Sequence, residues 1–579
     1  MVVRVSVREI VERIEHVLWP WHRKDGEDGD GDGEGEDDGS MNPVLLVPGI
    51  GGSILQAVDQ KGHKERVWVR LFQADHEFRS KLFSFYDPDT GKTQSLDKDI
   101  RIEVPEDRFG LYSCDILDPD VILRLNTVYY FHDLIQHMKT WGYKEGKTLF
   151  GFGYDFRQSN RLGETMDRLK LKLETMYEAS GGRKVDIITH SMGGLVVKSF
   201  LALHHEVFEK YVNSWIAVTA PFRGAPGFTM DTLLTGVDFL KGWQRELFVA
   251  KWSMHQLLIE CPSVYELMAH PHFDWSEPPE LRLWRKQAEE TGEEKVLLEA
   301  FGPKENLDVM MAALEENKLD YNGDKIPLPL NKNIVEWALE TQRIMQTAKL
   351  PEGVLFYNLY GTSFDTPHHT CYGSSKTPLQ ELTEILKTEA EFSCVDGDGT
   401  VPVESAMADG LNAQERVGIP GDHRGILMDQ HFFRIMKHWL KVGGADLEYD
   451  PETDYVMVPR RGFEFDSHME ESVAVAGPEE TEGGSLEAPP NQVYIATVET
   501  GSGSSSDIRA EAHAHVHPKE GQITEPEFQI STIGVAEGRD EEETKAALDQ
   551  VMAAASEEAK ARTSKSKRIV SDKTCYMRH

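Results

Sequence analysis

The sequence predicts an α/β fold built on a mainly parallel sheet. Short apolar runs that suit buried strands occur at 43–49, 147–156, 184–190, 213–221 and 354–362. Helical patterns separate these runs, at 132–141, 161–179, 192–206 and 428–441. Strands that are apolar along their whole length and alternate with helices are typical of a parallel sheet with both faces covered.

Changes in composition divide the chain into four parts. Residues 1–22 have apolar positions at helical spacing, so we expect an amphipathic helix, either docked on the protein body or lying in a membrane interface. Residues 23–41 form an acidic, glycine-rich linker. Residues 42–465 carry the strands and helices of the folded body. Residues 466–579 are rich in Gly, Ser, Pro and Glu, which predicts a mostly disordered tail with a short helix at 540–562.

The overall composition narrows the range of functions. The formal net charge of −36 opposes binding to nucleic acid and electrostatic docking on anionic lipid. The five cysteines are odd in number and include no CxxC pair, which favours a reduced, cytoplasmic protein. No apolar run approaches the ~20 residues that span a bilayer, and charged residues interrupt the N-terminus where a signal peptide would be apolar. We therefore expect a cytoplasmic monomer that meets membranes only peripherally.

The strongest local motif is KVDIITHSMGGLVVK at 184–198. A strand runs into Ser191, Met192 and two glycines follow, and an apolar helix begins. This pattern is typical of a nucleophile elbow, in which the serine hydroxyl projects from a tight strand-to-helix turn. Thr189 stands where such elbows usually carry their first glycine, so the turn must differ slightly. The alternative is a serine at an ordinary helix N-terminus.

An elbow serine needs two donors for the oxyanion of its tetrahedral intermediate. The backbone amide of Met192, the next residue, is the first candidate. LLVPGIGGS at 45–53 is a strand followed by a glycine-rich turn, and it offers the amide of Ile50 as the second. A phosphate-binding loop is the weaker interpretation, because no lysine follows these glycines.

The acid and the base should follow the serine in the chain, in that order. SCVDGDGTVP at 393–402 offers Asp398, with Asp396 as an alternative and a simple Asx turn as the non-catalytic interpretation. GDHRGILMDQHFF at 421–433 offers His423 in a loop and His431 within the next helix. Because the chain has 22 histidines, chemistry alone does not select one.

The ordered motifs resemble the lecithin:cholesterol acyltransferase family, most closely its plant cytosolic phospholipase A branch. They are VPGIGGS, YDFR (154–157), THSMGG, TAPFRGAPG (219–227), DGDGTVP and GDHRGIL, and they cover most of residues 42–442. The resemblance implies an α/β-hydrolase fold with a Ser191–Asp398–His423 triad. It also matches the Ile50 and Met192 amides to the family's oxyanion hole.

The resemblance further implies two elements that contact lipid. One is a membrane-contact insertion at about 57–95, around Trp68. The other is a mobile lid at about 228–262, with Phe228, Leu233 and Trp243; a buried cap helix is the alternative for these residues. Secreted relatives close the insertion with a disulfide, whereas this chain has no cysteine between residues 50 and 100.

These observations favour a serine-dependent phospholipase A that hydrolyses acyl esters of glycerophospholipids such as phosphatidylcholine through an acyl-enzyme. We expect no cofactor and no metal, and the expected partner is a phospholipid at a membrane surface. Two alternatives remain open. An O-acyltransferase would move the acyl group to a sterol or diacylglycerol, and a non-catalytic lipid-binding scaffold would use the linker and the tail to bind partners.

Overall fold

A computed structural model describes residues 41–69, 81–118, 129–236, 251–288, 294–321, 324–443 and 451, together with five strands beyond residue 490. The helix expected at 1–22, all but residue 41 of the acidic linker, and the helix expected at 540–562 lie outside the described residues. The chain divides into two compact units, 1–461 and 462–579, which are described separately.

A six-stranded parallel sheet forms the centre of the first unit. Its order is β17 (Glu415–Pro420), β14 (Leu355–Thr362), β9 (Val212–Val218), β8 (Val185–His190), β1 (Val44–Val47) and β7 (Leu149–Gly151). Every residue of β1 and β8 is buried, as expected of strands covered on both faces. The sheet confirms the α/β class that the sequence predicts.

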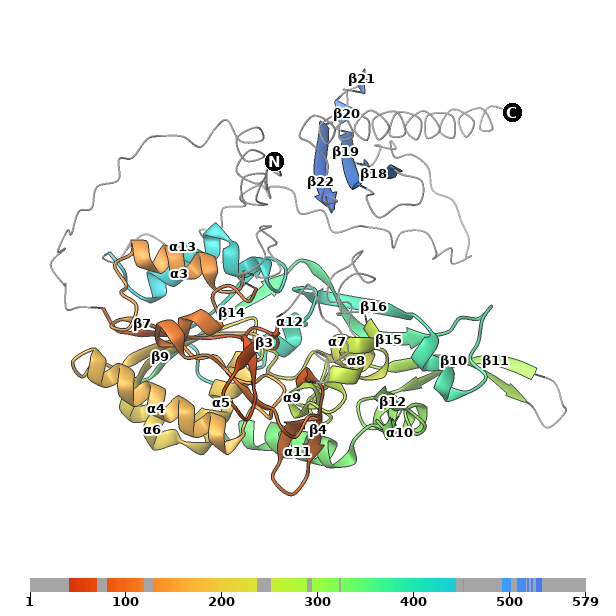
Figure 1. The fold of residues 1–579 in the computed structure, drawn as a ribbon, viewed down its shortest axis with the longest axis horizontal. Coiled ribbons are helices and arrows are strands. Elements are labelled where there is room, and N and C mark those ends of the chain that lie inside the picture. Colours follow the sequence, from red (N-terminus) through yellow and green to blue (C-terminus); the bar gives the residue numbers. More distant parts are fainter. Residues whose placement is uncertain are drawn as a thin grey trace. The chain divides into compact units, whose positions relative to one another are not determined.

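Helices cover both faces of this sheet (Figure 1). On one side lie α3 (His132–Thr140) and α13 (Gln430–Trp439), and on the other α4 (Gly163–Ala179), α5 (Gly193–Leu203) and α6 (His205–Tyr211). The first nine residues of α5 are all buried, because most of them are apolar and the Lys198 ammonium donates to the Asp409 carbonyl at 2.6 Å. The helix that follows the candidate nucleophile is thus held deep in the core.

The remaining elements of the first unit pack beside this sheet (Figure 1). A four-stranded sheet has the order β11 (Glu294–Phe301), β10 (Leu281–Ala288), β15 (Phe364–Tyr372) and β16 (Ala390–Gly397), and β12 (Lys318–Tyr321) pairs with β13 (Asp324–Pro327). The further helices are η1 (Asp107–Ser113), α7 (Pro226–Leu234), α8 (Lys251–Leu258), α9 (Pro262–Glu266), α10 (Asn306–Ala313), α11 (Lys332–Met345), η2 (Leu382–Lys387), α12 (Val403–Met407) and η3 (Gly425–Met428).

The insertion expected at 57–95 is built from short antiparallel strands. β2 (Leu55–Val58) pairs with β3 (Lys64–Trp68) and β6 (Arg101–Glu103), and β4 (Ser84–Asp87) pairs with β5 (Lys92–Ser95). An isolated two-stranded hairpin is only marginally stable in water, so the β4–β5 hairpin depends on contacts with the rest of the first unit.

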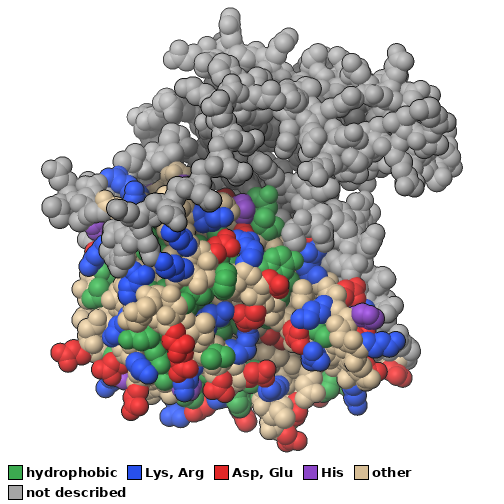
Figure 2. Space-filling model, turned by 60° about the vertical axis from the view of Figure 1, so that its left-hand side comes forward, with side chains coloured by type: hydrophobic (Ala, Val, Ile, Leu, Met, Phe, Trp, Pro, Cys, Tyr) green, Lys and Arg blue, Asp and Glu red, His purple; other side chains and the backbone are tan. Residues whose placement is uncertain are grey.

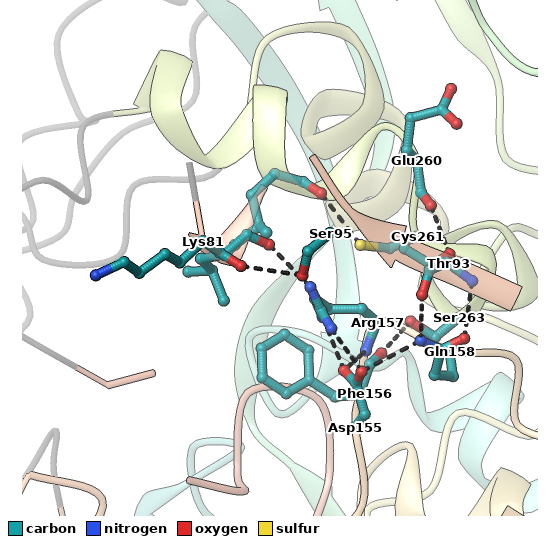
Figure 3. Close-up of polar contacts among 12 residues, drawn as sticks. Lys81, Thr93, Ser95, Asp155, Phe156, Arg157, Gln158, Glu260, Cys261 and Ser263 are labelled. Carbon is teal, nitrogen blue, oxygen red and sulfur yellow. Dashed lines mark hydrogen bonds and ion pairs between the residues drawn. The ribbon is translucent and has the colours of Figure 1, made fainter. Parts of the chain in front are cut away.

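The segment that follows β7 supplies those contacts (Figure 3). Arg157, 1% exposed, donates to both carboxylate oxygens of Asp155 at 2.9 and 2.7 Å and to the Leu82 carbonyl at 2.9 Å. Gln158 and the backbone of Thr93 exchange hydrogen bonds of 2.7 and 2.9 Å. The Thr93 hydroxyl donates to the Glu260 carbonyl at 2.9 Å. The hairpin is thereby joined both to the sheet and to the turn between α8 and α9.

Burial and the pairing with Arg157 have opposite effects on the pKa of the Asp155 carboxyl. Burial acts to raise its pKa, but the Arg157 charge and the hydrogen bonds from Arg157 and Gln158 outweigh burial, so the pKa lies below its ordinary value. Both members of the pair are therefore charged at neutral pH. A buried pair of this kind is sensitive to the loss of either partner.

On the face of the first unit that Figure 2 shows, charges of both signs are mixed. Figure 2 shows one face on which acidic and basic side chains of the described residues are interspersed with small hydrophobic areas. Every helix that the structure describes is too short or too polar to cross a bilayer.

In the second unit the structure describes five strands, and the mostly disordered tail stays a prediction for the remaining residues. β18 (Gln492–Thr500), β19 (Ile508–Val516) and β22 (Glu527–Ile533) form an antiparallel sheet, and β20 (Pro518–Lys519) pairs with β21 (Gln522–Ile523). The sequence analysis did not predict these strands, because it weighed composition above pattern. Alternation of apolar and polar residues, as in IRAEAHAHV, favours strands even where glycine and serine surround them.

We predict that Arg157→Ala lowers the free energy of unfolding by about 3–5 kcal/mol, because it leaves a buried carboxylate without its partner. Urea denaturation measures the change. Arg343→Ala is the matched control: Arg343 pairs with Glu340 through a side chain that is 71% exposed, so its loss should leave stability nearly unchanged. Equal effects of the two substitutions would contradict the anchoring role of Arg157.

Candidate active site

Ser191 occupies the turn between β8 and α5 with a left-handed backbone, φ 54°. Its amide donates to the Val218 carbonyl at 2.9 Å, and its own carbonyl accepts from the Gly194 amide at 2.9 Å. A non-glycine residue in this region of φ/ψ is strained, and such strain is held where a function needs it. The geometry is that of the elbow expected from the sequence.

The two residues after Met192 must lack side chains. A Cβ on Gly193 would lie 2.5 Å from the Pro48 carbonyl oxygen, and one on Gly194 would lie 2.6 Å from the Ala220 Cβ. The start of α5 therefore touches the ends of two strands, β1 and β9. Only glycine permits both approaches.

Thr189, the departure from the usual elbow pattern, has a role of its own inside β8. Its side chain is fully buried, and its hydroxyl accepts a hydrogen bond from the Trp215 indole at 3.0 Å. The threonine thus fills a core position beside Trp215, and the turn at Ser191 still forms.

His423 and Asp398 converge on the serine. His423 Nε2 lies 2.8 Å from Ser191 Oγ, and His423 Nδ1 lies 2.7 Å from Asp398 Oδ2. The His423 amide also donates to the Asp398 carbonyl at 2.8 Å, so backbone and side chain hold the pair together. The serine hydroxyl, imidazole and carboxylate thus form one continuous chain of hydrogen bonds.

Asp398 is fixed by its surroundings. It is 2% exposed, and Oδ1 accepts from the amides of Thr400 and Val401 at 2.9 and 2.7 Å. Its Cβ lies 2.5 Å from where a Cβ on Gly361 would be, so the acid packs against the end of β14. Two backbone amides on Oδ1 and the His423 ring on Oδ2 thus fix the orientation of the carboxylate.

The other candidates from the sequence lie elsewhere. Asp396 is exposed, and its carboxylate accepts from the Ser363 amide at 2.6 Å. His431 is buried within α13, where its amide is bound by the Asp429 side chain at 2.7 Å. The structure brings neither residue into contact with Ser191.

The loop after β1 lies directly against the nucleophile. A Cβ on Gly49 would be 2.6 Å from the Ser191 Cβ, so the turn Pro48–Ile50 and the turn at Ser191 are in contact. The amides of Ile50 and Met192 donate to no acceptor among the described residues. Both can therefore donate to an oxyanion beside Ser191, and their role as oxyanion donors stays a prediction.

Trp68 does not face lipid, contrary to the expectation from the sequence. It is 1% exposed, its indole donates to the Gly51 carbonyl at 2.7 Å, and its ring packs on Phe156 at 5.3 Å between centroids. Its large apolar ring and single donor suit this internal position. Trp68 therefore supports the loop that carries Ile50.

The lid residues fall into three cases. Leu233 is fully buried in α7, so the cap-helix alternative describes it better than an exposed lipid contact. Phe228 is half-buried against Ala225, Val401 and Ala406. Trp243 lies outside the described residues.

A strained serine and a histidine–carboxylate pair at the end of a parallel sheet define a serine hydrolase of the α/β-hydrolase class. The family model "Lecithin:cholesterol acyltransferase" matches residues 80–410, and the chain belongs to that family.

Three relatives illustrate the similarity. "Lecithin-cholesterol acyltransferase-like 4" of Arabidopsis thaliana is 56% identical over 77% of this chain and 83% of its own. "Phospholipase A(1) LCAT3" of the same plant is 51% identical over 69% of this chain and 91% of its own. "Lysosomal phospholipase A and acyltransferase" of Bos taurus is 28% identical over 34% of this chain and 51% of its own.

We predict that Asp398→Asn lowers kcat on a chromogenic short-chain ester by about 10⁴-fold, because the amide no longer selects the His423 tautomer that accepts the serine proton. Asp396→Asn removes the same charge two residues away and should leave kcat within about twofold, since exposed substitutions away from the reacting atoms have small effects. The reverse ranking would show that the acid has been assigned to the wrong carboxylate.

Proposed function

We propose that this protein is a phospholipase A that hydrolyses a fatty acyl ester of glycerophospholipids such as phosphatidylcholine. The proposal rests on two contacts of the His423 ring. Its Nε2 lies 2.8 Å from Ser191 Oγ, and its Nδ1 lies 2.7 Å from Asp398 Oδ2. The choice of a phospholipid rests on the family and on the 51% identical relative named a phospholipase A(1). That name also leads us to place the scissile ester at the sn-1 position.

The reaction begins with acyl transfer to the enzyme. Ser191 Oγ attacks the ester carbonyl while His423 Nε2 takes its proton, and Asp398 stabilises the imidazolium that forms. The amides of Ile50 and Met192 hold the oxyanion. When the tetrahedral intermediate collapses, the C–O bond to the lysophospholipid breaks, and His423 gives its proton to the departing oxygen.

Hydrolysis then regenerates the enzyme. A water molecule attacks the acyl carbonyl as His423 takes its proton, and the same amides hold the second oxyanion. The bond between the acyl carbon and Ser191 Oγ breaks, and the proton on His423 returns to the serine. Water is consumed, and a free fatty acid leaves.

Transacylation is the second candidate. It uses the same acyl-enzyme but replaces water with an alcohol, such as a sterol or a diacylglycerol. The family name and the bovine relative named a phospholipase A and acyltransferase favour it. The balance depends on how well the acceptor competes with water at the acyl-enzyme.

We further propose that the protein is cytoplasmic, monomeric and bound to membranes only peripherally. Four cysteines fall within the described residues, and all are free thiols, two of them buried. Free thiols favour a reducing compartment. A fluorescent fusion that entered the secretory pathway would contradict this assignment, and sedimentation measures the oligomeric state.

We predict that the full-length protein releases fatty acid from phosphatidylcholine with different chains at sn-1 and sn-2, and that the sn-1 chain dominates the product. Ser191→Ala should reduce turnover about 10⁶-fold without unfolding the protein. Mass spectrometry of the fatty acid and lysophospholipid reads both the rate and the position. Fatty acid release that survived this substitution would overturn the proposal.

Adding a sterol or a diacylglycerol to the same vesicles separates the two candidates. Hydrolysis yields free fatty acid at an unchanged rate, whereas transacylation diverts the acyl chain into sterol ester or triacylglycerol. Acyl transfer that exceeded hydrolysis would make the second candidate the main activity.

A further inference from the structure

The Tyr130 hydroxyl lies at the junction of two parts of the proposed active site. It accepts a hydrogen bond from the Gly49 amide at 2.7 Å, and it lies 2.6 Å from His190 Nδ1. The other ring nitrogen, His190 Nε2, lies 2.8 Å from the carbonyl oxygen of His423. A chain of three hydrogen bonds therefore runs from the loop before Ile50 to the backbone of the proposed catalytic base.

The direction of each bond follows from the atoms involved. The His423 carbonyl can only accept, so His190 Nε2 must carry the proton. In a neutral imidazole the other nitrogen, Nδ1, then accepts, and it receives the single proton of the Tyr130 hydroxyl. The Tyr130 oxygen keeps a lone pair for the Gly49 N–H. One arrangement of protons thus satisfies every group.

Burial keeps this arrangement in place. Tyr130 is 5% exposed and His190 is 1% exposed, so water does not compete for these bonds. Burial lowers the pKa of His190 well below its ordinary value, and the nearby His423 and Arg424 side chains lower it further. Burial also raises the pKa of the Tyr130 phenol. Both groups are therefore neutral, as the arrangement requires.

The glycines of the first loop make room for the tyrosine ring. A Cβ on Gly52 would lie 2.6 Å from ring carbons of Tyr130, and one on Gly49 would lie 3.0 Å from its hydroxyl. Arg424, the residue after His423, contacts the segment 129–130. Its guanidinium lies 5.2 Å from the Tyr130 ring centroid and donates to the Tyr129 carbonyl at 3.1 Å. Both loops thus contact the segment that carries Tyr130.

We infer that Tyr130 and His190 are positioning residues, which set the distance between the oxyanion-binding loop at Gly49–Ile50 and the loop that carries His423. The inference rests on the proposed function, since it assigns His423 as base and Ile50 as oxyanion donor. Neither side chain hydrogen-bonds to Ser191 Oγ or to the His423 ring nitrogens, although the His190 ring lies beside the His423 ring, 4.9 Å between centroids. They act through backbone groups, the Gly49 amide on one side and the His423 carbonyl on the other.

This role predicts a defect in turnover rather than in substrate binding. A displacement of about 1 Å in a base or an oxyanion donor can lower a rate about 100-fold, while contacts with the rest of the substrate are kept. We expect Tyr130→Phe to lower kcat by about 10- to 100-fold and to leave KM within about twofold.

Tyr154→Phe is the matched control for Tyr130→Phe. It also removes a buried tyrosine hydroxyl, but the Tyr154 hydroxyl has no hydrogen-bond partner among the described residues. Its kcat should stay within about twofold of wild type. The two variants are compared on phosphatidylcholine vesicles with full-length protein, and thermal unfolding is measured in parallel.

Substitutions at His190 separate positioning from general destabilisation. The Gln side chain of His190→Gln can accept from Tyr130 and donate to the His423 carbonyl, so we expect kcat within about fivefold of wild type. His190→Leu fills similar space without either bond and should lose as much kcat as Tyr130→Phe. Rescue by glutamine is the result that a merely space-filling role would not produce.

Tyr130→Phe or His190→Leu with full kcat, or a loss seen in KM alone, would overturn the inference. Equal losses of kcat in His190→Gln and His190→Leu would also overturn the inference. These two variants keep the test decisive if Tyr130→Phe does not fold. Wild type and Ser191→Ala are assayed alongside. A wild type without Ser191-dependent activity refutes the proposed function, whereas an active wild type with an unaffected Tyr130→Phe refutes only the positioning role.

Discussion

The site depends on the close approach of two turns, the one after β1 and the one after β8. Gly49 lies so close to Ser191 that a Cβ there would be 2.6 Å from the serine Cβ, and Gly193 lies as closely on the Pro48 carbonyl. Parallel pairing of β1 with β8 brings both turns to the same edge of the sheet. The nucleophile and both proposed oxyanion donors follow from this contact. A side chain at either glycine would push the turns apart.

The triad is then completed by chain segments from distant parts of the sequence. His423 follows β17, at the edge of the central sheet, and Asp398 follows β16, which belongs to a different sheet. Backbone amides hold the acid, and the acid's own carbonyl holds the histidine amide. Arg157 joins Leu82 of the insertion to the segment after β7, and Trp68 of β3 donates to the Gly51 carbonyl, next to Ile50.

Much of this could be predicted from the sequence. The parallel sheet follows from apolar strands alternating with helices, and the elbow follows from a strand, a serine and two glycines. Geometry resolved what chemistry left open, because Asp396 and His431 are of the right type but lie away from Ser191. The role of Tyr130 could not be predicted, since nothing near it in the sequence resembles a motif and its partners are 60 and 81 residues away. The expectation that Trp68 contacts lipid failed, because an apolar pattern in the sequence does not reveal whether a side chain faces lipid or the protein core. The strands of the second unit were missed because composition was weighed above alternation.

The central claim is that Ser191 reacts while the amides of Ile50 and Met192 receive the negative charge. A crystal structure of the protein inactivated by an alkyl fluorophosphonate measures this most directly, since the adduct mimics the tetrahedral intermediate. The account predicts one phosphonyl group on Ser191 Oγ, with its oxygen about 2.7–3.1 Å from both amide nitrogens. An adduct on another residue, or an oxygen on Ser191 that pointed away from the loop after β1, would contradict the account.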